Sequence, residues 1–506
     1  MPVKAPRTSR HLEVERKFDV VESTVSPSFE GIAAVAHVEK SPTQSLDATY
    51  FDTPTQDLAR NKITLRRRTG GPDAGWHLKL PAGPDARTEI RAPLTASGPG
   101  GHDTVPSELL DVVLAIVRDR PLEPVARITT QRETQVLYGA EGTALAEFSN
   151  DHVTAWAAGA SGDNDAQPAE QEWREWELEL VETNGTADTE LLSRLSNRLL
   201  DAGAAPAGHA SKLARVLGTT ARPNGTQLPA DPVRRAVGEQ INELLLWDRA
   251  VRADADDAVH QMRVTIRKIR SLLADSQDPS ESSDRAWILD ELRELGNVLG
   301  AARDAEVLAQ RYQLALDKLP PELVRGRIRE RLVEGARHRY RTGLRRSLIA
   351  MRSQRYFRLL DALDAVVAEI PAAAPGEDQA PVTIDAAYKK VRKAAKAAAR
   401  VEAGAEHERD LALHRIRKRA KRLRYTAAAT GADKVSEQAK VIQTLLGDHQ
   451  DSVVSREHLS HQAEAARTAG EDTFTYGLLY QQEADLAERC RQQLDDALRK
   501  LAKSVR

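Results

Sequence analysis

Charged side chains at every second position are the residues whose types and spacing could do chemistry. Glu13 and Glu15 form one acidic set, and Glu175, Glu177 and Glu179 form another. Because the side chains of a β-strand alternate between its two faces, each set lies on one face of a strand. Neighbouring carboxylates repel unless a cation lies between them, and carboxylate oxygens suit a divalent cation. The spacing therefore predicts a metal site.

Basic side chains follow the same alternation in nearby segments. The positions that share strand faces are Lys17, Arg66, Arg68, Lys79, Arg87 and Arg91, with His77 beside Lys79 and Glu89 between the last two. Such side chains suit a phosphate chain. For any single strand, a solvated face with cross-strand ion pairs explains the pattern equally well. The five charged strands together favour a lumen that holds metal and polyphosphate, with apolar faces packed outward against helices.

The elements that must position these residues are short strands in the first part of the chain. Alternating runs bounded by turn residues occur at 12–18, 63–68, 76–80, 87–94, 144–148 and 175–180. Helices are predicted at 106–119, after a capping Ser, and at 187–203, ending at Gly203. A loop rich in Ala, Gly and Asp is predicted at 157–171. The first part is therefore predicted to be α+β, dominated by antiparallel strands.

The rest of the chain has a helical pattern with an internal repeat. The polar, Pro-containing segment 219–231 predicts a linker, and a break at 371–381 divides the following residues into halves of about 232–370 and 382–506. Segments 260–270 and 414–424 align without gaps. Their basic residues recur at offsets that share one helix face. This pattern indicates an internal duplication.

The aligned segments carry a cationic stripe beside an apolar one. The stripe consists of His260, Arg263, Arg267 and Arg270 in the first copy and His414, Arg417, Lys421 and Arg424 in the second, and Lys268 and Arg422 add a basic group at the next offset, so all ten are expected to bind an anion. Ile266 and Ile269, and then Ile416 and Leu423, supply the apolar side. Asp304 and Asp451 belong to a second repeated motif, each four residues after a Gly. One basic helix face is usually only solvated, but two matched copies favour an anionic ligand.

The net charge of −2 conceals an opposition between the two parts. Residues 1–230 carry a net charge of −8 and residues 231–506 carry +6, and +13 is concentrated in residues 321–430. A basic surface of this kind is expected to meet nucleic acid, an anionic membrane or polyphosphate. Aromatic residues make up only 4% of the chain. Because stacking on bases needs aromatic side chains, nucleic acid is disfavoured as the partner.

Several classes of protein are excluded by what the sequence lacks. It has no run of 18 apolar residues and no apolar signal segment, which predicts a cytoplasmic protein that does not enter a membrane. Cys490 is the single cysteine, so a disulfide framework and a cysteine-based zinc site are excluded. No Walker loop, Ser-His-Asp order or HExxH motif occurs.

An ExExK motif opens the first part at residues 13–17, and four further motifs follow in order. They are TYFDT (49–53), ITLRRRTGGPDAGWHLKLP (63–81), EWELEL (175–180) and HASKLARVL (209–217). Together these motifs resemble the CYTH, or triphosphate tunnel metalloenzyme, superfamily over about residues 8–218. The resemblance implies an antiparallel eight-stranded tunnel barrel that binds inorganic triphosphate with Mg²⁺ or Mn²⁺ and hydrolyses it to pyrophosphate and phosphate.

The resemblance also implies roles for individual residues. The implied catalytic residues are Glu13, Glu15, Lys17, Glu177 and Glu179. The implied metal ligands are Glu13, Glu15, Glu147, Glu177 and Glu179, while Glu147 and Asp151 could instead pair the basic groups. The implied triphosphate ligands are Lys17, Arg66, Arg68, Lys79, Arg87, Arg127, Arg132 and Lys212. Arg127 and Arg132 differ in parity, so both can face the lumen only if a bulge separates them.

The duplicated stripe of residues 232–506 resembles the CHAD family, the conserved-histidine α-helical domain. This resemblance implies an all-α pair of related helical bundles around a basic cleft that binds inorganic polyphosphate through the cationic stripe. A CYTH domain followed by a CHAD domain is a known bacterial order, so each resemblance supports the other. Together they imply a cytoplasmic protein associated with polyphosphate granules.

Three functions remain open on these residues. The first is a metal-dependent inorganic triphosphatase held near polyphosphate by its helical part. The second is a non-catalytic protein that binds or is targeted to polyphosphate. The third is a nucleotide or thiamine triphosphatase or an adenylyl cyclase, for which no base-recognition signal is present. The intact acidic pairs Glu13/Glu15 and Glu177/Glu179 favour the first.

Overall fold

The computed structural model describes residues 9–94, 104–157, 170–181, 188–218, 232–275, 282–369, 383–402 and 405–505. The chain divides into two compact units, Met1–Arg293 with Ile349–Ile370 and Glu294–Leu348 with Pro371–Arg506. The first unit contains a β-barrel, and the second is built from helices. The predicted linker (219–231), the predicted break (371–381) and most of the predicted loop (157–171) lie outside the described residues.

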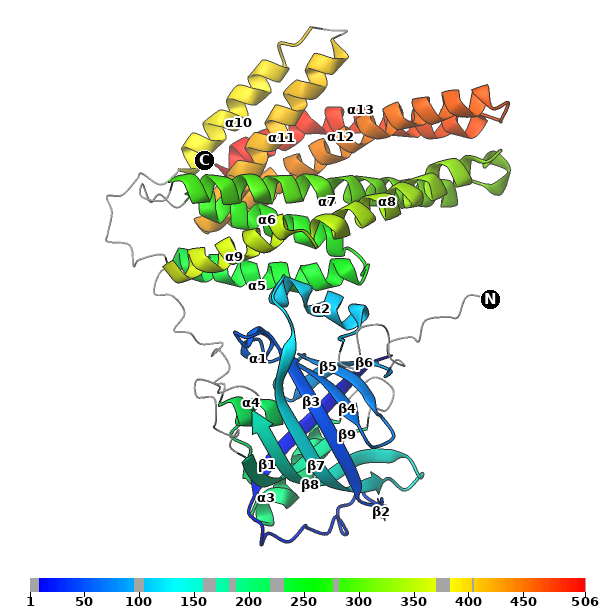
Figure 1. Ribbon diagram of the computed structural model, residues 1–506. Helices are drawn as coiled ribbons and strands as arrows, with labels where there is room; N and C mark the ends of the chain where they lie inside the picture. The colour runs from blue at the N-terminus through cyan, green and yellow to red at the C-terminus, as the bar shows by residue number, and fades with distance from the viewer. Residues whose placement is uncertain are drawn as a thin grey trace. The chain divides into compact units, whose positions relative to one another are not determined.

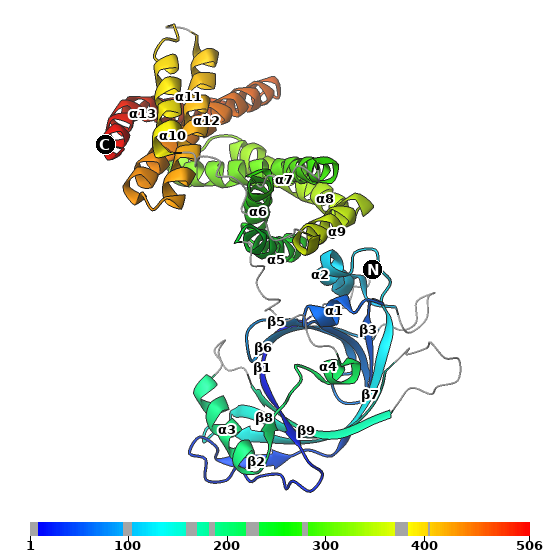
Figure 2. The same cartoon turned by 90° about the vertical axis from the view of Figure 1, so that its left-hand side faces the viewer.

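Within the described residues, eight antiparallel strands form a closed barrel. The strands are β1 (Ser9–Val20), β3 (Gln44–Asp52), β4 (Thr64–Thr69), β5 (Gly75–Pro81), β6 (Ala86–Ala92), β7 (Glu123–Tyr138), β8 (Ala144–Ala157) and β9 (Glu170–Leu180). Their order is β1-β6-β5-β4-β3-β7-β8-β9, and β9 pairs with β1 to close the ring seen in Figure 2. Short β2 (His37–Lys40) and β10 (Ala205–Pro206) pair with β7 and β1. The predicted eight-stranded antiparallel barrel is confirmed.

The strand faces are arranged as the charge alternation predicts. Glu15 on β1 lies opposite Glu179 on β9, and Lys17 lies opposite Glu177. These side chains all line the barrel interior. Apolar side chains on the alternate positions, such as Trp176, face outward and are fully buried. The barrel therefore has a charged lumen and an apolar outer layer.

Two helices cover the apolar outer layer (Figure 1). α2 (Ser107–Val117) packs on a cluster that contains Trp76 and Leu78, and α3 (Thr189–Asp201) packs on one that contains Phe148 and Trp176. Burial of each such side chain contributes roughly 1.5–3 kcal/mol to folding. These contacts hold the strands in the register that turns the charged side chains inward.

A third helix lies in line with the lumen. Figure 2 looks along the barrel and shows α4 (Lys212–Leu217) within the ring of strands. Leu213 and Val216 of α4 pack with Ile128 and Tyr50 from the inner face of the barrel. The hydroxyl of Ser211 caps α4 by accepting a hydrogen bond from the Ala214 N–H. α4 thus brings Lys212 to the lumen.

The structure confirms both helices predicted in the first part of the chain but changes the residues at their ends. The helix predicted at 106–119 is α2, but its N-cap is Pro106 and no side chain caps it, so the predicted Ser cap is wrong. The helix predicted at 187–203 is α3, capped by the Asp188 carboxylate. Gly203 follows α3 with φ of 97°, a conformation that favours glycine. β7 has no counterpart among the alternating runs, and β8 extends well beyond residue 148.

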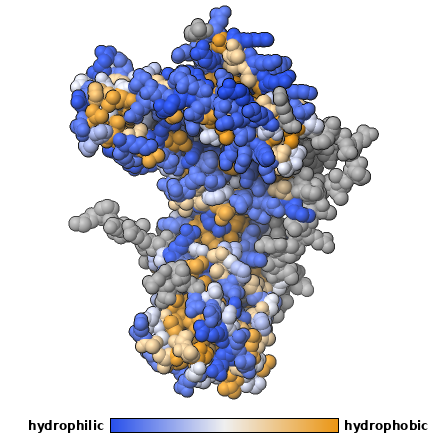
Figure 3. All heavy atoms as spheres, turned by 180° about the vertical axis from the view of Figure 1, so that it is seen from behind, coloured by the Kyte–Doolittle hydropathy of each residue, from blue (hydrophilic) through white to orange (hydrophobic). Residues whose placement is uncertain are grey.

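Helices make up the described chain after residue 231, which confirms the predicted all-α second part. They are α5 (Pro232–Arg252), α6 (Ala258–Asp275), α7 (Ser282–Asp317), α8 (Gly335–Ala350), α9 (Gln354–Glu369), α10 (Ile384–Ala398), α11 (Glu406–Ala429), α12 (Asp433–Thr468) and α13 (Phe474–Ser504). A short α1 (Asp57–Arg60) belongs to the barrel part. None of these described helices combines the length and apolar character needed to cross a bilayer. Figure 3 shows hydrophilic side chains over most of the visible helical surface.

Candidate functional site in the barrel

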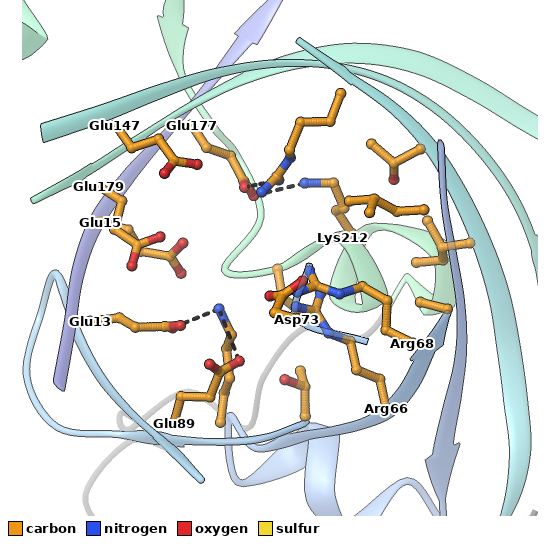
Figure 4. A pocket seen from close by; sticks show the side chains of 18 of the residues that line it. Glu13, Glu15, Arg66, Arg68, Asp73, Glu89, Glu147, Glu177, Glu179 and Lys212 are labelled. Atoms are coloured by element: carbon orange, nitrogen blue, oxygen red, sulfur yellow. Dashed lines mark hydrogen bonds and ion pairs between the residues drawn. The ribbon is translucent and has the colours of Figure 1, made fainter. Parts of the chain in front are cut away.

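The barrel encloses a charged cavity of about 440 Å³. Its acidic lining residues are Glu13, Glu15, Asp73, Glu89, Glu147, Glu177 and Glu179, and its basic ones are Lys17, Arg66, Arg68, Lys79, Arg87, Arg91, Arg132 and Lys212. Figure 4 shows acidic and basic side chains that point into one space from different parts of the ring. The structure therefore brings the residues predicted for metal and triphosphate together in one cavity, with Arg127 as the exception.

Four carboxylates, those of Glu13, Glu15, Glu147 and Glu179, form the acidic wall of the cavity (Figure 4). Burial, with repulsion from the other three carboxylates added to it, raises the pKa of Glu179 to about 7. Burial also raises the pKa of Glu13 and Glu147. Glu15 differs: burial opposes its ionisation, but Lys17 and Lys79 lower its pKa to about 2. Because Lys17 and Lys79 pair with Glu15 and Glu13, the carboxylates of the acidic wall that a divalent cation would stabilise most are those of Glu147 and Glu179.

A second carboxylate cluster is already neutralised by cations of the protein. Asp151, Glu175 and Glu177 have oxygens within 4.8 Å of one another. Lys212 Nζ lies 2.9, 2.6 and 2.7 Å from them, and Arg132 lies 2.6 Å from Asp151 and 2.5 Å from Glu177. Burial opposes ionisation of Glu177, but the surrounding cations hold its pKa well below the usual range. Glu177 was predicted to be a metal ligand. In the structure its charge is already neutralised by Lys212 and Arg132, unlike that of Glu179.

Arg66 and Arg68 of β4 form a basic wall opposite the acidic wall (Figure 4). Arg66 donates a hydrogen bond to the Tyr50 hydroxyl at 3.3 Å. The Nε atoms of both arginines are buried and have no hydrogen-bond partner among the described residues. Burial, with repulsion from Arg66 and Arg132, lowers the pKa of Arg68 to about 9. Buried guanidinium donors without a partner favour an anionic ligand such as phosphate.

The remaining cations lie between the two walls and pair with glutamates. Lys79 Nζ lies 2.6 Å from Glu13, and Lys17 Nζ lies 2.9 Å from Glu15. Arg87 Nε lies 3.6 Å from Glu15. A bound polyanion and a bound metal ion would each satisfy one partner of these pairs. The cavity is therefore organised to separate a negative end from a positive end.

Arg127 lies outside the cavity. β7 pairs with β8 without a register shift from Ala126 to Leu137, so no bulge separates Arg127 from Arg132. The inward positions of β7 are even-numbered and include Arg132, while the Arg127 guanidinium lies 2.6 Å from Asp47 and is 60% exposed. We therefore leave Arg127 out of the proposed site.

Tyr50 and Arg91 line the cavity, although neither is among the triphosphate ligands that the family resemblance implies. Strand parity already places Arg91 on one face with Arg87, among the basic residues expected to suit a phosphate chain. Tyr50 lies within the TYFDT motif, but no role was predicted for it. Nothing in the spacing indicates that the Tyr50 hydroxyl meets Arg66.

The cationic stripe of the second repeat lies along one side of α11. His414, Arg417, Lys421 and Arg424 are half-buried, whereas Arg422 is exposed. Burial lowers the pKa of His414, and its Nδ1, like Arg417 Nε, has no hydrogen-bond partner within the described chain. Gly447 of the second repeated motif lies beside the Arg417 guanidinium, since a Cβ there would be in ordinary contact with it at 3.6 Å. The two repeated motifs therefore meet through Arg417.

The stripe of the first repeat lies on α6. His260, Arg263 and Arg270 are half-buried, and Arg267 and Lys268 are exposed. Ile266 and Ile269 on the same helix are fully buried, as are Ile416 and Leu423 on α11. The predicted combination of one apolar and one cationic side is confirmed on both helices.

Comparison with known proteins identifies two families in the chain. The CYTH domain family matches residues 11–197, and the CHAD domain family matches residues 235–460. Uncharacterized proteins of Mycobacterium tuberculosis, from strains CDC 1551 / Oshkosh and ATCC 25618 / H37Rv, are each 76% identical over 514 residues. Each alignment covers 100% of this chain and 99% of the relative.

Solved structures match parts of the chain. PptA from Streptomyces chartreusis is 18% identical, with a TM-score of 0.43 over 53% of this chain and 98% of its own. The CHAD domain from the plant Ricinus communis is 25% identical, with a TM-score of 0.39 over 53% of this chain and 90% of its own. A Hippeastrum protein described as having a dominant triphosphatase activity is 16% identical, with a TM-score of 0.24 over 41% of this chain and 95% of its own.

Proposed function

Because this chain belongs to the proteins in which a CYTH domain is followed by a CHAD domain, we propose that its barrel hydrolyses inorganic triphosphate and its helices bind inorganic polyphosphate. CYTH domains are metal-dependent and act on phosphoanhydrides. One observation carries the proposal: a single cavity of about 440 Å³ holds Glu147 and Glu179, whose pKa is raised, opposite Arg66 and Arg68, whose Nε atoms have no hydrogen-bond partner among the described residues. A metal-bound triphosphate satisfies both walls at once.

The acidic wall fits Mg²⁺ or Mn²⁺. Its four members would supply the carboxylate oxygens that these cations prefer. The raised pKa of Glu179 supports this role, because a bound cation would favour the ionised carboxylate against the burial and the repulsion that raise its pKa. When bound there, the ion would neutralise phosphate charge and make a water molecule more acidic, and thus a better nucleophile.

The basic residues would bind and orient the substrate. Arg66 and Arg68 offer planar donors to phosphate oxygens, and Arg132 and Lys212 add positive charge deeper among their carboxylates. Hydrolysis joins a water oxygen to the terminal phosphorus and breaks its bond to the bridging oxygen, giving phosphate and pyrophosphate. The developing charge on the leaving pyrophosphate is stabilised by these fixed cations.

The two stripes support polyphosphate binding by the helical part. A flexible chain of phosphates needs cations along its length and no base stacking. His414 and Arg417 are half-buried, and His414 Nδ1 and Arg417 Nε have no hydrogen-bond partner in the described part of the chain, which favours an anion at the stripe. Binding of long chains would also bring the protein to polyphosphate granules in the cytoplasm.

A substrate comparison tests the proposed activity. Phosphate release should be fast and metal-dependent with tripolyphosphate and slow with ATP, thiamine triphosphate and long-chain polyphosphate. Initial rates with Mg²⁺ and with Mn²⁺ provide the measurement, and a reaction with EDTA provides the control. Release from none of the four, with tight long-chain binding retained, would instead establish a non-catalytic polyphosphate-binding protein.

Metal binding should weaken as the pH falls through 7. A carboxylate must be ionised to bind a cation, and a group with a pKa of about 7 is about nine-tenths ionised at pH 8 and about one-tenth ionised at pH 6. The apparent affinity for Mn²⁺ should therefore fall about tenfold over this interval. Calorimetric titration at both pH values measures the change, and Glu179→Gln should remove most of it. An equal affinity at pH 6 and pH 8 would contradict the assignment of Glu179.

A further inference from the structure

The turn between β4 and β5 brings a carboxylate of its own to the basic wall. Asp73 lies in this turn, lines the cavity and forms an ion pair with the Arg68 guanidinium (Figure 4). The Arg68 side chain is 7% exposed and that of Asp73 is 29% exposed. Asp73 thus forms an ion pair with the arginine that, in the proposed function, binds a phosphate group.

The path of this turn is fixed by two glycines that precede Asp73. Gly70 and Gly71 have φ of 79° and 74°, which L side chains rarely adopt. A Cβ on Gly70 would lie 2.1 Å from the Ser45 carbonyl oxygen. The turn therefore passes too close to β3 for any other residue at position 70.

A buried histidine fixes the backbone of Asp73. His77 Nε2 lies 2.9 Å from the Asp73 carbonyl oxygen, within hydrogen-bond distance. His77 Nδ1 lies 2.9 Å from Glu89 on β6, and both side chains are 1% exposed. This bridge ties the backbone of the turn at Asp73 to the barrel.

Arg68 has more hydrogen-bonding capacity than Asp73 satisfies. Its buried Nε has no partner among the described residues, and Arg66 and Arg132 repel its charge. A phosphate group offers more acceptor oxygens and more negative charge than one carboxylate. A phosphate at Arg68 and the Asp73 carboxylate would also repel each other. The two anions therefore compete for the same guanidinium.

We propose that Asp73 is a built-in competitor of the substrate, which pairs with Arg68 while the cavity is empty and is displaced by a phosphate group of the bound triphosphate. This inference rests on the proposed function of the barrel. Binding then breaks one ion pair of the protein, so the affinity for triphosphate is lower than the basic wall alone would give. Return of Asp73 to Arg68 assists release of the pyrophosphate product.

Calorimetric binding of sodium tripolyphosphate, without metal, tests this role in the full-length protein. Asp73→Asn should lower the dissociation constant by roughly three- to tenfold, the effect of removing one partly buried charge pair. Asp73→Ala should act in the same direction, and inhibition by pyrophosphate should become stronger in both variants. Asp85→Asn is the matched control, because Asp85 lies in the next turn and pairs at 2.9 Å with Arg16 away from the cavity lining.

The direction of the change decides between competition and a structural role. If Asp73 only supported the turn or oriented Arg68, both Asp73 variants would bind tripolyphosphate more weakly or equally, and that result would overturn the inference while leaving the proposed function intact. If neither the wild type nor the variants bound tripolyphosphate, and none hydrolysed it with Mn²⁺, the proposed function would fail, and the inference with it.

Discussion

Replacement of Glu13 and Glu15 by glutamine should lower metal-dependent phosphate release from tripolyphosphate by about 100-fold or more. Both residues belong to the acidic wall, and Glu15 is held ionised by Lys17 and Lys79. Glutamine keeps the shape of each side chain but removes two of the charges that would hold the metal ion. Initial rates at saturating Mn²⁺ measure the loss.

A matched control separates this effect from damage to the barrel. Glu172→Gln changes an exposed glutamate at an outward position of β9, the strand that carries Glu177 and Glu179, and it should leave the rate unchanged. Long-chain polyphosphate binding by the double variant should also remain, because the cationic stripe is untouched. An unchanged rate in the double variant would refute the metal assignment.

Strand parity explains how much of this cavity could be predicted. A side chain two positions along a strand returns to the same face, so Glu13 and Glu15 can be assigned to one face from sequence, and both line the cavity. The same rule shows that Arg127 and Arg132 face opposite sides unless a bulge intervenes. β7 contains no bulge between them, and Arg127 lies outside.

Strand parity could not predict which basic side chain pairs with which glutamate inside the lumen. Glu177 and Glu179 have the same parity, yet Lys212 and Arg132 surround Glu177 while Glu179 faces other carboxylates. Lys212 belongs to α4, and the spacing of residues within β9 does not indicate that this helix lies beside Glu177. Whether a glutamate pairs with a lysine or arginine or is free to bind a metal ion therefore depends on the tertiary structure.

Two further features were missed because their local sequence carries no charge alternation. The inward side chains of β7 include Ile128, Thr130 and Thr134 beside Arg132, so the strand lacks the pattern that marked the others. Asp73 lies in a Gly- and Pro-containing turn, which sequence reasoning treats as a connection. Its contact with Arg68 joins the turn to β4, and nothing in the local sequence pattern indicates it.

Reversal of Arg417 and Lys421 to glutamate should weaken long-chain polyphosphate binding at least about tenfold, and adding Arg263→Glu and Arg267→Glu should abolish it. Each reversal replaces an attraction for phosphate by a repulsion along the cationic stripe. Triphosphate hydrolysis should persist in both variants, because none of these residues lines the barrel cavity. Fluorescence anisotropy with labelled polyphosphate measures the binding.

The same helix provides a control of equal charge. Arg415 and Arg419 lie on the exposed face of α11 that also carries Arg422, away from Arg417 and Lys421, so Arg415→Glu with Arg419→Glu changes the net charge as much as the test pair does. A long-range effect of net charge would weaken binding equally in both pairs, whereas a built anion site responds mainly to Arg417 and Lys421. Affinity should also fall steeply with salt in the wild type, and each lost contact should reduce the slope of log affinity against log salt by about 0.7. Equal losses in the two pairs would show that polyphosphate is attracted by the overall charge of the helix, and the half-buried stripe would then have to be explained by packing alone.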